Sequence, residues 1–285
     1  MRISLEDTEG EVGFTTQPAR SRRVQAKKIV DTEFADDLAL ITNTLKEAQK
    51  LLISVQQTAK CFGLNINESK TKYLVVNVQD DDLTLLKTGG GEELEEVKDF
   101  VYLGAWIATT EHDFRVRKAK AWAACHKMKA IWKSNMRRNL KIRLFQATVE
   151  SILLYGTETW TVSESLKKRI DGCYSRMLRM ALNVDWKEHR TNKEVFGSLP
   201  RASSKIQARR MRLAGHVQRH DDLVAHDLLL WEPNHGRRGR GRPPLTFVDV
   251  LRKDTGLQDT GEIKRLMADR KLWRDKVETR TLKPP

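Results

Sequence analysis

Cysteine is scarce in this sequence, and long apolar runs are absent from it. Cys61, Cys125 and Cys173 are far apart, odd in number and without C-x-x-C spacing, which excludes a disulfide framework and a zinc knuckle and fits a reducing compartment. No segment approaches the roughly 20 apolar residues of a membrane span, and the amino-terminal MRISLEDTEGEVGF lacks the apolar run of a signal peptide. We therefore expect a soluble intracellular protein, in the nucleus or the cytoplasm, with no membrane partner.

Acidic residues are few relative to basic ones. The 285 residues include 38 Asp and Glu against 52 Lys and Arg, so the formal net charge is +14. This surplus favours a polyanionic partner, and nucleic acid is the first candidate. With 39% hydrophobic and 32% charged residues, the chain can bury one large core or two smaller ones and should fold, at least in part.

The stretch TEFADDLALI, residues 32 to 41, places Asp36 and Asp37 side by side in an apolar context. Charged groups are costly to bury unless they are paired or hold a metal, so a buried pair would need a cation. The flanking runs IVDTEF and LALIT predict a hairpin with both carboxylates at its tip. Such carboxylates suit Mg²⁺, the usual metal of two-ion nucleotidyl transfer. The pair alone also fits a solvated turn, where Asp is common.

The segments that follow predict a helix and then short strands. Thr44 and Glu47 form a capping-box pattern ahead of apolar residues at helical spacing, and Gly63 supplies a stop. LNINESKTKYLVVNV, residues 64 to 78, predicts a strand, a polar turn and a strand, and DFVYLGAWIA, residues 99 to 108, predicts a further strand pair.

The rest of the sequence predicts helices. A boundary near residue 110 would separate an α+β region from a basic helical region. The expected helical ranges are 113–135, 139–156, 163–183, 203–220 and 262–279.

The ordered set FADD, GLNINESKT and YLGAWI resembles the carboxy-terminal half of the palm of a non-LTR (LINE-type) retrotransposon reverse transcriptase, an RNA-directed DNA polymerase. FADD is similar to the aromatic-x-Asp-Asp catalytic motif of that family, GLNINESKT to its next motif, and YLGAWI to the hairpin that grips the primer terminus. ILLYGTETWT, RLAGHVQRHDD and GRRGRGRPPLTFVDVLRKD are similar to its thumb and carboxy-terminal region. The resemblance therefore covers the chain from about residue 12.

The resemblance implies a role for each motif residue. Asp36 would be a direct Mg²⁺ ligand, and Asp37 a weaker ligand or an orienting carboxylate. Lys70, in GLNINESKT, would neutralise or protonate the leaving pyrophosphate. Tyr102, Leu103 and Gly104 would belong to the primer grip. Outside this resemblance, Lys70 would be an ordinary turn lysine.

The resemblance also implies the fold class and the division of the chain. We expect an α+β protein in which a partial reverse-transcriptase palm, made of hairpin, helix and short antiparallel strands, precedes a mainly α-helical thumb and a basic carboxy-terminal region. The expected parts are a basic, weakly ordered lead-in at 1–28, the partial palm at 29–110, the helical thumb-like region at 111–200, and a basic helical tail at 201–285 with an Arg-rich loop at 236–244.

The sequence departs from the family in one respect. The family's catalytic site also needs an aspartate from an earlier palm strand and a glycine-rich nucleotide-selecting segment with the fingers, and both would lie upstream of Met1. With one acidic strand end instead of two, we expect the isolated chain, a truncated nucleotidyltransferase, to have no polymerase activity. RNA and DNA, as template and primer, are the expected partners, and a palm and fingers supplied in trans are a further one.

An arginine-rich tract gives a second, independent signal for nucleic acid. Basic residues outnumber acidic ones from Arg201 to Pro243, and GRGRP, residues 239 to 243, is similar to an AT-hook. A solvated basic linker and phosphate contacts without sequence preference are the alternatives, and we favour phosphate contacts. The candidate nucleic-acid-binding residues are Arg209, Arg210, Arg212, Arg237, Arg238, Arg240 and Arg242.

For the remaining polar and aromatic residues we predict surface, structural or core-packing roles. His216 and His220 are four residues apart and could reach one metal ion, but with His226 they lie in an Arg-rich region, and we favour a surface or phosphate-contacting role. We expect Glu158 and Asp171 to be structural. Most of the tryptophans should pack in the core, and they are Trp106, Trp122, Trp132, Trp160, Trp186, Trp231 and Trp273.

Two alternatives to a polymerase fragment remain open. The first is a non-enzymatic nucleic-acid-binding protein derived from a retroelement, in which the acid pair is a relic. The second is a pseudogene product without a stable fold, whose amino-terminal half exposes sheet edges.

Overall fold

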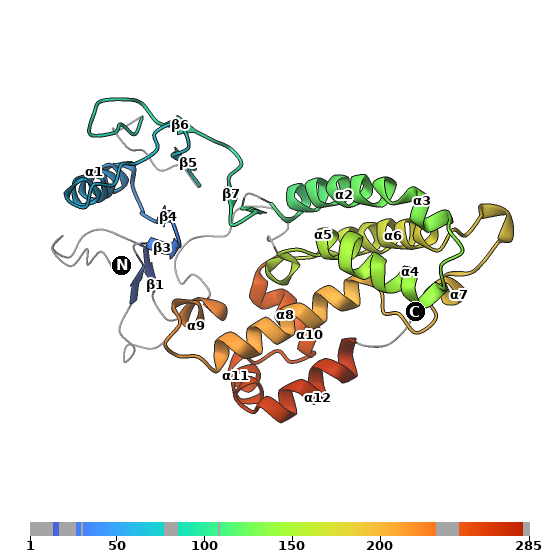
Figure 1. Ribbon diagram of the computed structural model, residues 1–285. Helices are drawn as coiled ribbons and strands as arrows, with labels where there is room; N and C mark the ends of the chain where they lie inside the picture. The colour runs from blue at the N-terminus through green and yellow to red at the C-terminus, as the bar shows by residue number, and fades with distance from the viewer. Residues whose placement is uncertain are drawn as a thin grey trace. The chain divides into compact units, whose positions relative to one another are not determined.

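A computed structural model shows the chain as two compact units (Figure 1). It describes residues 14–16, 27–29, 31–76, 85–107, 109–231 and 245–281. The first unit comprises Met1–Phe100 with Trp231–Gly236, and the second comprises Val101–Leu230 with Arg237–Pro285. Among the described helices, none has both the length and the apolar character needed to cross a bilayer.

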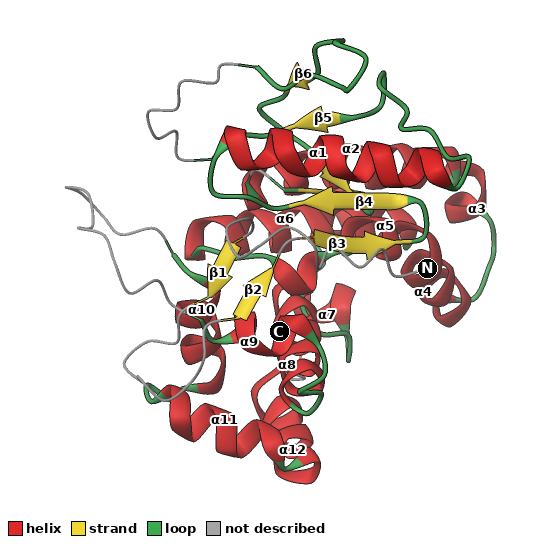
Figure 2. Cartoon of the chain, turned by 90° about the vertical axis from the view of Figure 1, so that its left-hand side faces the viewer, coloured by secondary structure: helices red, strands yellow, loops and turns green. Residues whose placement is uncertain are grey.

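A β-hairpin carries the acid pair, as the sequence predicts. Strands β3 (Asp31–Phe34) and β4 (Asp37–Leu40) pair antiparallel, with Phe34 opposite Asp37 at the end next to the loop. Figure 2 shows this hairpin beside helix α1 (Leu45–Cys61). Upstream, β1 (Phe14–Thr16) pairs antiparallel with β2 (Lys27–Ile29).

Helix α1 begins at the predicted cap, with one difference in its hydrogen bonds. The Thr44 hydroxyl accepts the N–H of Glu47 at 3.2 Å, but the Glu47 carboxylate accepts the N–H of Asn43, at 3.1 Å. The side chains still satisfy two backbone donors at the helix start. At the other end Gly63 has a φ of 74°, a left-handed conformation that favours glycine after a helix.

The segment after α1 is less regular than predicted. Within the described part of 64–78, only Lys72–Tyr73 (β5) forms a strand, and it pairs in parallel with Glu95–Glu96 (β6). The predicted strand beginning at Leu64 is therefore wrong. A small cluster of Leu52, Leu86 and Leu94 forms the apolar core here.

The second unit opens with a two-stranded hairpin and continues as helices. The hairpin consists of β7 (Val101–Tyr102) and β8 (Ala105–Trp106). The helices are α2 (Thr110–Lys127), α3 (Lys129–Lys133), α4 (Arg138–Phe145), the π-helical turn η1 (Gln146–Glu150), α5 (Ser151–Leu153), the short turn η2 (Thr157–Thr159), α6 (Glu164–Ala181), the short turn η3 (Trp186–Glu188), α7 (Asn192–Phe196), α8 (Ala202–Gln218), α9 (Val224–Leu229), α10 (Phe247–Thr255), α11 (Thr260–Ala268) and α12 (Arg270–Thr281).

Two apolar clusters hold this helical unit together, and α8 contributes to both. The larger contains the fully buried side chains Trp132, Phe145 and Tyr174. The smaller joins Met211 of α8 to Trp273 of α12 and to residues of α10 and α11. Because one helix supplies side chains to both clusters, α8 ties the carboxy-terminal helices to the rest of the unit.

The predicted helices are present, but several are interrupted. The range 113–135 is divided between α2 and α3, 139–156 contains the π-helical turn, and 262–279 is divided between α11 and α12. Helices α7, α9 and α10 were not predicted. The unit boundary falls after Phe100 rather than near 110, because the 101–106 hairpin bonds to residues of the helical unit.

The cysteines provide a test of the described cores. Cys61 is exposed, whereas Cys125 and Cys173 are buried. Burial raises the pKa of Cys125 to about 11 and also raises the pKa of Cys173. Since the thiolate is the reactive form, we expect one thiol to react quickly with a disulfide reagent at pH 8 and the other two to react only on unfolding. Rapid reaction of all three in native buffer would contradict these cores.

A pair of helix glycines tests the packing of α8 on α12. A Cβ at Gly215 would collide with the indole of Trp273, whose Nε1 donates to the Met211 carbonyl at 2.8 Å. A Cβ at Gly172, in α6, would meet no atom within 4 Å. We expect Gly215→Ala to lower the free energy of unfolding by about 1–3 kcal/mol and Gly172→Ala to raise it by about 0.5–1 kcal/mol. Thermal denaturation of both variants measures this, and equal effects would count against the predicted collision.

Candidate catalytic hairpin and nucleic-acid interface

The tip of the β3–β4 hairpin presents both aspartates to solvent. Ala35 and Asp36 form the two-residue loop, and Asp37 begins β4. Asp36 and Asp37 are exposed, and Phe34 beside them is 62% exposed. Within this unit the pair therefore resembles the solvated turn that the residues alone also fit, because the neighbouring apolar side chains are themselves uncovered. Within the described residues, the two carboxylates remain exposed to water, so they do not need a cation to compensate for lost hydration.

The backbone at this tip is strained. Ala35 has a φ of 55°, in the left-handed region that costs a residue with a Cβ on the order of 1–2 kcal/mol. Positive φ at the first loop position is typical of type II′ hairpin turns, where glycine is preferred. Strain of this kind is concentrated at functional sites, and here it lies next to the acid pair.

Lys70 lies on a separate turn. The Asn67 carbonyl accepts the N–H groups of Lys70 and Thr71 at 3.1 and 2.9 Å, and the Asn67 side chain also accepts from Lys70, at 3.2 Å. In the part of the chain that is described, no hydrogen bond or ion pair joins Lys70 to Asp36 or Asp37. The two motifs thus lie in one unit without touching.

The predicted primer-grip residues form the turn of the β7–β8 hairpin. Tyr102 pairs with Ala105, and the loop residues Leu103 and Gly104 have φ values of 48° and 78°. Positive φ at both loop positions is the signature of a type I′ turn. This turn belongs to the helical unit rather than to the one that carries Asp36.

Side chains from the helices hold the carbonyl groups of this turn. Arg117 of α2 donates to the Gly104 carbonyl, and the Tyr155 hydroxyl donates to the Leu103 carbonyl at 2.9 Å. The Arg117 guanidinium also lies 4.4 Å from the centre of the Tyr155 ring, a cation–π distance. Both loop carbonyls are therefore fixed by the same pair of stacked side chains.

Arg117 is paired with a buried carboxylate, that of Asp113. Asp113 is 1% exposed, and its two oxygens accept from Arg117 Nε at 3.3 Å and from Trp160 Nε1 at 2.9 Å. The Trp160 carbonyl in turn accepts from Arg210 at 2.7 Å. Sequence reasoning missed this network because, although Asp113 and Arg117 have i,i+4 spacing on α2, Trp160 and Arg210 are about 50 residues away from their partners.

Among the predicted nucleic-acid-binding residues that the structure describes, Arg210 is one whose assignment needs correction. Its side chain is buried and pairs with Asp254 of α10 at 2.7 Å, so it cannot contact a phosphate on the surface. Burial raises the pKa of Asp254, and the Arg210 charge opposes that effect. Arg210 therefore joins α8 to α10 within the fold.

The other predicted arginines differ in their exposure. Arg209 is partly buried and donates to the Leu154 carbonyl, whereas Arg212 is exposed. Of the three arginines on α8, Arg212 is thus the one open to a ligand. Arg237, Arg238, Arg240 and Arg242 lie outside the described residues.

A second polar network, also missed from the sequence, lies at the π-helical turn. Glu150 is 7% exposed and accepts from Tyr174 and from Lys205, each at 2.6 Å. Burial and the Glu150 charge raise the pKa of the Tyr174 hydroxyl, which therefore stays protonated and donates. The expected structural role of Asp171 is confirmed nearby, since its carboxylate accepts from the Ser203 N–H and hydroxyl at 2.8 and 2.7 Å.

The histidines do not form a metal site within the described residues. The rings of His216 and His220 lie 4.4 Å apart, and His226 contacts Gln218 at 2.9 Å. No group of three or more His, Cys, Asp or Glu side chains among the residues described could hold a metal ion.

Comparison with known proteins gives one informative match. The chain is 28% identical over 267 residues to an uncharacterized transposon-derived protein of Caenorhabditis elegans, and the match covers 88% of this chain and 96% of that protein. No family model matches the chain, and no solved structure matches it. The similarity supports an origin in a transposable element.

The buried carboxylate behind the 103–104 turn can be tested on helix α2. Asp113→Asn would leave the Arg117 guanidinium, whose side chain is 8% exposed, without its counter-charge, and we expect a loss of about 3–5 kcal/mol in the free energy of unfolding. Glu111→Gln on the same helix is the control, because Glu111 and Arg169 pair with 66% and 55% of their side chains exposed. That change should cost no more than about 1 kcal/mol. Denaturant titration measures both, and similar values would refute the assignment.

Proposed function

We propose that this chain is derived from the reverse transcriptase of a non-LTR retrotransposon and corresponds to the end of its palm, its thumb and a basic tail. On this proposal Asp36 and Asp37 contribute to the Mg²⁺ site of an RNA-directed DNA polymerase, and the helical unit contacts primer and template. The observation that carries it is the acid pair at the tip of a tight hairpin whose loop begins with a residue of positive φ.

Two further observations support the proposal. The order of hairpin, capped helix, Asn67–Thr71 turn and 101–106 hairpin in the described chain matches the order of motifs that the resemblance implies. The similarity to a transposon-derived protein agrees with that source.

The carboxylates fit Mg²⁺ in kind. Mg²⁺ takes oxygen ligands and is usually bound by one or two carboxylates together with substrate phosphates, and Asp36 and Asp37 are both open to such a ligand. When bound, the ion would stabilise charge on the reacting phosphate. In this arrangement Asp36, within the loop, is the direct ligand, and Asp37, held in β4 opposite Phe34, orients the site.

A non-enzymatic nucleic-acid-binding protein is the second candidate. The net charge of +14 favours it, as does Arg212, the predicted contact residue that is exposed on α8. It predicts salt-sensitive binding of RNA and DNA with neither metal binding nor extension.

Metal-directed cleavage tests the acid pair. With Fe²⁺ in place of Mg²⁺ and a poly-rA/oligo-dT primer–template bound, we expect the chain to be cut near the hairpin tip. Asp36→Ala with Asp37→Ala should abolish the cut, because both candidate ligands are gone. Asp221→Ala with Asp222→Ala, which removes another exposed adjacent pair, should not.

Primer extension with Mg²⁺, run in parallel, separates the two candidates. Binding without hairpin cleavage or extension would support the non-enzymatic candidate instead. Template-dependent extension that the hairpin variant loses would show an active polymerase, contrary to the inactivity expected of the isolated chain.

A further inference from the structure

Trp186 is an exception among the tryptophans, because 77% of its surface is exposed. The expectation of core packing holds for Trp132, Trp160 and Trp273, which are buried, and fails here. A single exposed apolar side chain is common on protein surfaces, so a ligand at Trp186 is inferred only from the groups that surround the indole.

The turn that carries Trp186 is held in place by its own hydrogen bonds. The Asp185 carboxylate accepts the Lys187 N–H at 2.9 Å, and the Glu188 carboxylate accepts the Asp185 N–H, also at 2.9 Å. After the turn, Arg179 of α6 donates to the Arg190 carbonyl at 2.8 Å. An aromatic ring on a fixed turn binds with little loss of conformational entropy.

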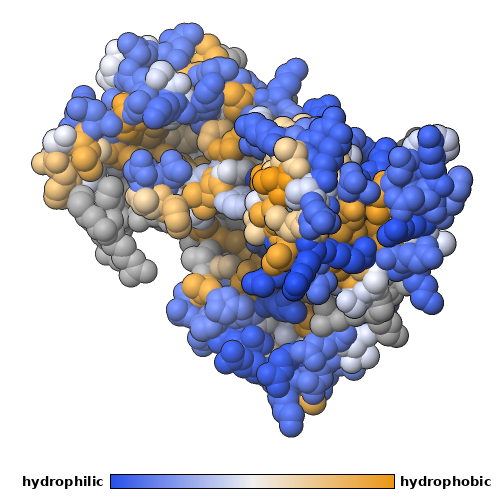
Figure 3. Space-filling view, turned by 45° about the vertical axis from the view of Figure 1, so that its right-hand side comes forward, coloured by the Kyte–Doolittle hydropathy of each residue, from blue (hydrophilic) through white to orange (hydrophobic). Residues whose placement is uncertain are grey.

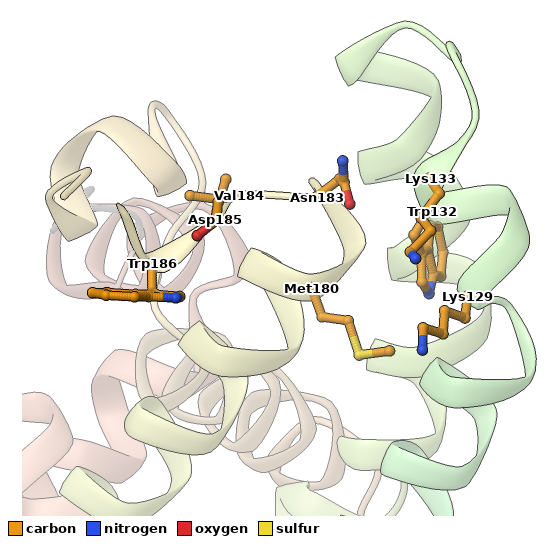
Figure 4. Close-up of a pocket in the computed structure, with 8 residues that line it drawn as sticks. All are labelled: Lys129, Trp132, Lys133, Met180, Asn183, Val184, Asp185 and Trp186. Atoms are coloured by element: carbon orange, nitrogen blue, oxygen red, sulfur yellow. The ribbon is translucent and has the colours of Figure 1, made fainter. Parts of the chain in front are cut away.

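A hollow of about 340 Å³ lies beside the indole and is lined on its other side by helix α3. Figure 4 shows Trp186 on one wall, Lys129 and Lys133 on the other, and Met180 between them, with its side chain directed toward Lys129. The volume falls within the roughly 300–1,000 Å³ of small-ligand sites.

The hollow is electropositive. Lys129 and Lys133 are four residues apart on α3, a spacing at which like charges repel on a helix face. Lys141, 8% exposed, adds a third charge next to it, with its Nζ donating to the Trp132 carbonyl at 2.6 Å. In the described part of the chain none of these three lysines forms an ion pair. Asp185 also lines the hollow and keeps its negative charge while it caps the turn, so the two lining lysines outnumber one lining acid; Glu188 is paired with Arg190 at 2.7 Å.

We infer that this hollow binds one unstacked nucleotide of single-stranded nucleic acid, with the base on the Trp186 indole and the phosphate at Lys129 and Lys133. Indole and ammonium groups supply the two contacts that such a strand offers, a π-face and an anionic backbone. An apolar peptide would satisfy the indole but leave the lysines without a partner, and an acidic peptide would do the reverse.

The basic character continues away from the hollow along two packed helices. Lys118 of α2 and Arg176 of α6 both act electrostatically on the buried Cys173 between them, and both are exposed. Figure 3 shows one face of the molecule, on which hydrophilic residues surround smaller hydrophobic areas. A strand leaving the hollow would meet these side chains with its next phosphates. The inference rests on the helical unit alone and stands whether or not Asp36 and Asp37 are catalytic.

Fluorescence anisotropy of labelled rU12 and dT12 on the full chain tests the site. Trp186→Ala should weaken binding on the order of tenfold, since stacking on an aromatic ring is worth about 1–3 kcal/mol per base, and Trp186→Phe should recover most of it. Lys129→Ala with Lys133→Ala should reduce the slope of log K against log salt by about 0.7, because the two lysines contact one phosphate and each neutralised phosphate contributes roughly that much on single strands. Trp186→Ala should leave that slope unchanged. The RNA and DNA oligonucleotides show which sugar the site prefers.

Three controls make the result decisive. Phe62→Ala removes another exposed aromatic ring, 61% exposed, and Lys264→Ala with Lys271→Ala removes two exposed lysines elsewhere; neither should reproduce the losses. A duplex of the same length should not depend on Trp186, because its bases are already stacked. Unchanged single-strand affinity in Trp186→Ala, an equal loss on the duplex, or equally tight binding of a polyglutamate peptide through the same residues would overturn the inference.

Discussion

A buried carboxylate, that of Asp113, connects elements of the helical unit that are far apart in the chain. A carboxylate removed from water is tolerated only when its oxygens are paired, and here Arg117 and Trp160 each satisfy one of them, at 3.3 and 2.9 Å. Arg117 also donates a hydrogen bond to the Gly104 carbonyl in the 103–104 turn. The Trp160 carbonyl group accepts a hydrogen bond from Arg210, and Arg210 in turn pairs with Asp254 of α10. One side chain thereby links the first hairpin of the unit to one of its last helices.

The elements that could be predicted from the sequence are those specified by neighbouring residues. The hairpin around Asp36 and helix α1, with its Thr44 cap, need only local signals, and both are present. The strand expected from Leu64 depends on a partner strand, which the described residues do not supply. Helix α10 shows the opposite error, since its capping box, Thr246 with Asp249, was visible in the sequence and was overlooked.

The candidate sites divide in the same way. The family resemblance made Asp36, Asp37 and the 102–104 turn candidate site residues, but it gave no sign of the networks of Asp113 and Glu150, whose partners lie up to 55 residues away. A run of arginines does not reveal which members face the core, so Arg210 and Arg212 received the same role although α8 buries the first and exposes the second. Trp186 was grouped with the core tryptophans although Asp185 and Lys187 flank it, and these charged neighbours are the signal in the sequence that could have indicated its exposure.

Two hydrogen bonds fix the turn: Arg117 donates to the Gly104 carbonyl and Tyr155 donates to the Leu103 carbonyl. These bonds have a mechanical consequence. A two-stranded hairpin of this length is not stable alone, so its position is set by Arg117 of α2 and by Tyr155, two residues after the end of α5. Because Arg117 is a residue of α2, its hydrogen bond to the Gly104 carbonyl couples the turn directly to that helix. A change in the orientation of α2 would therefore move the turn, and a molecule in contact with the turn would be subject to the same movement.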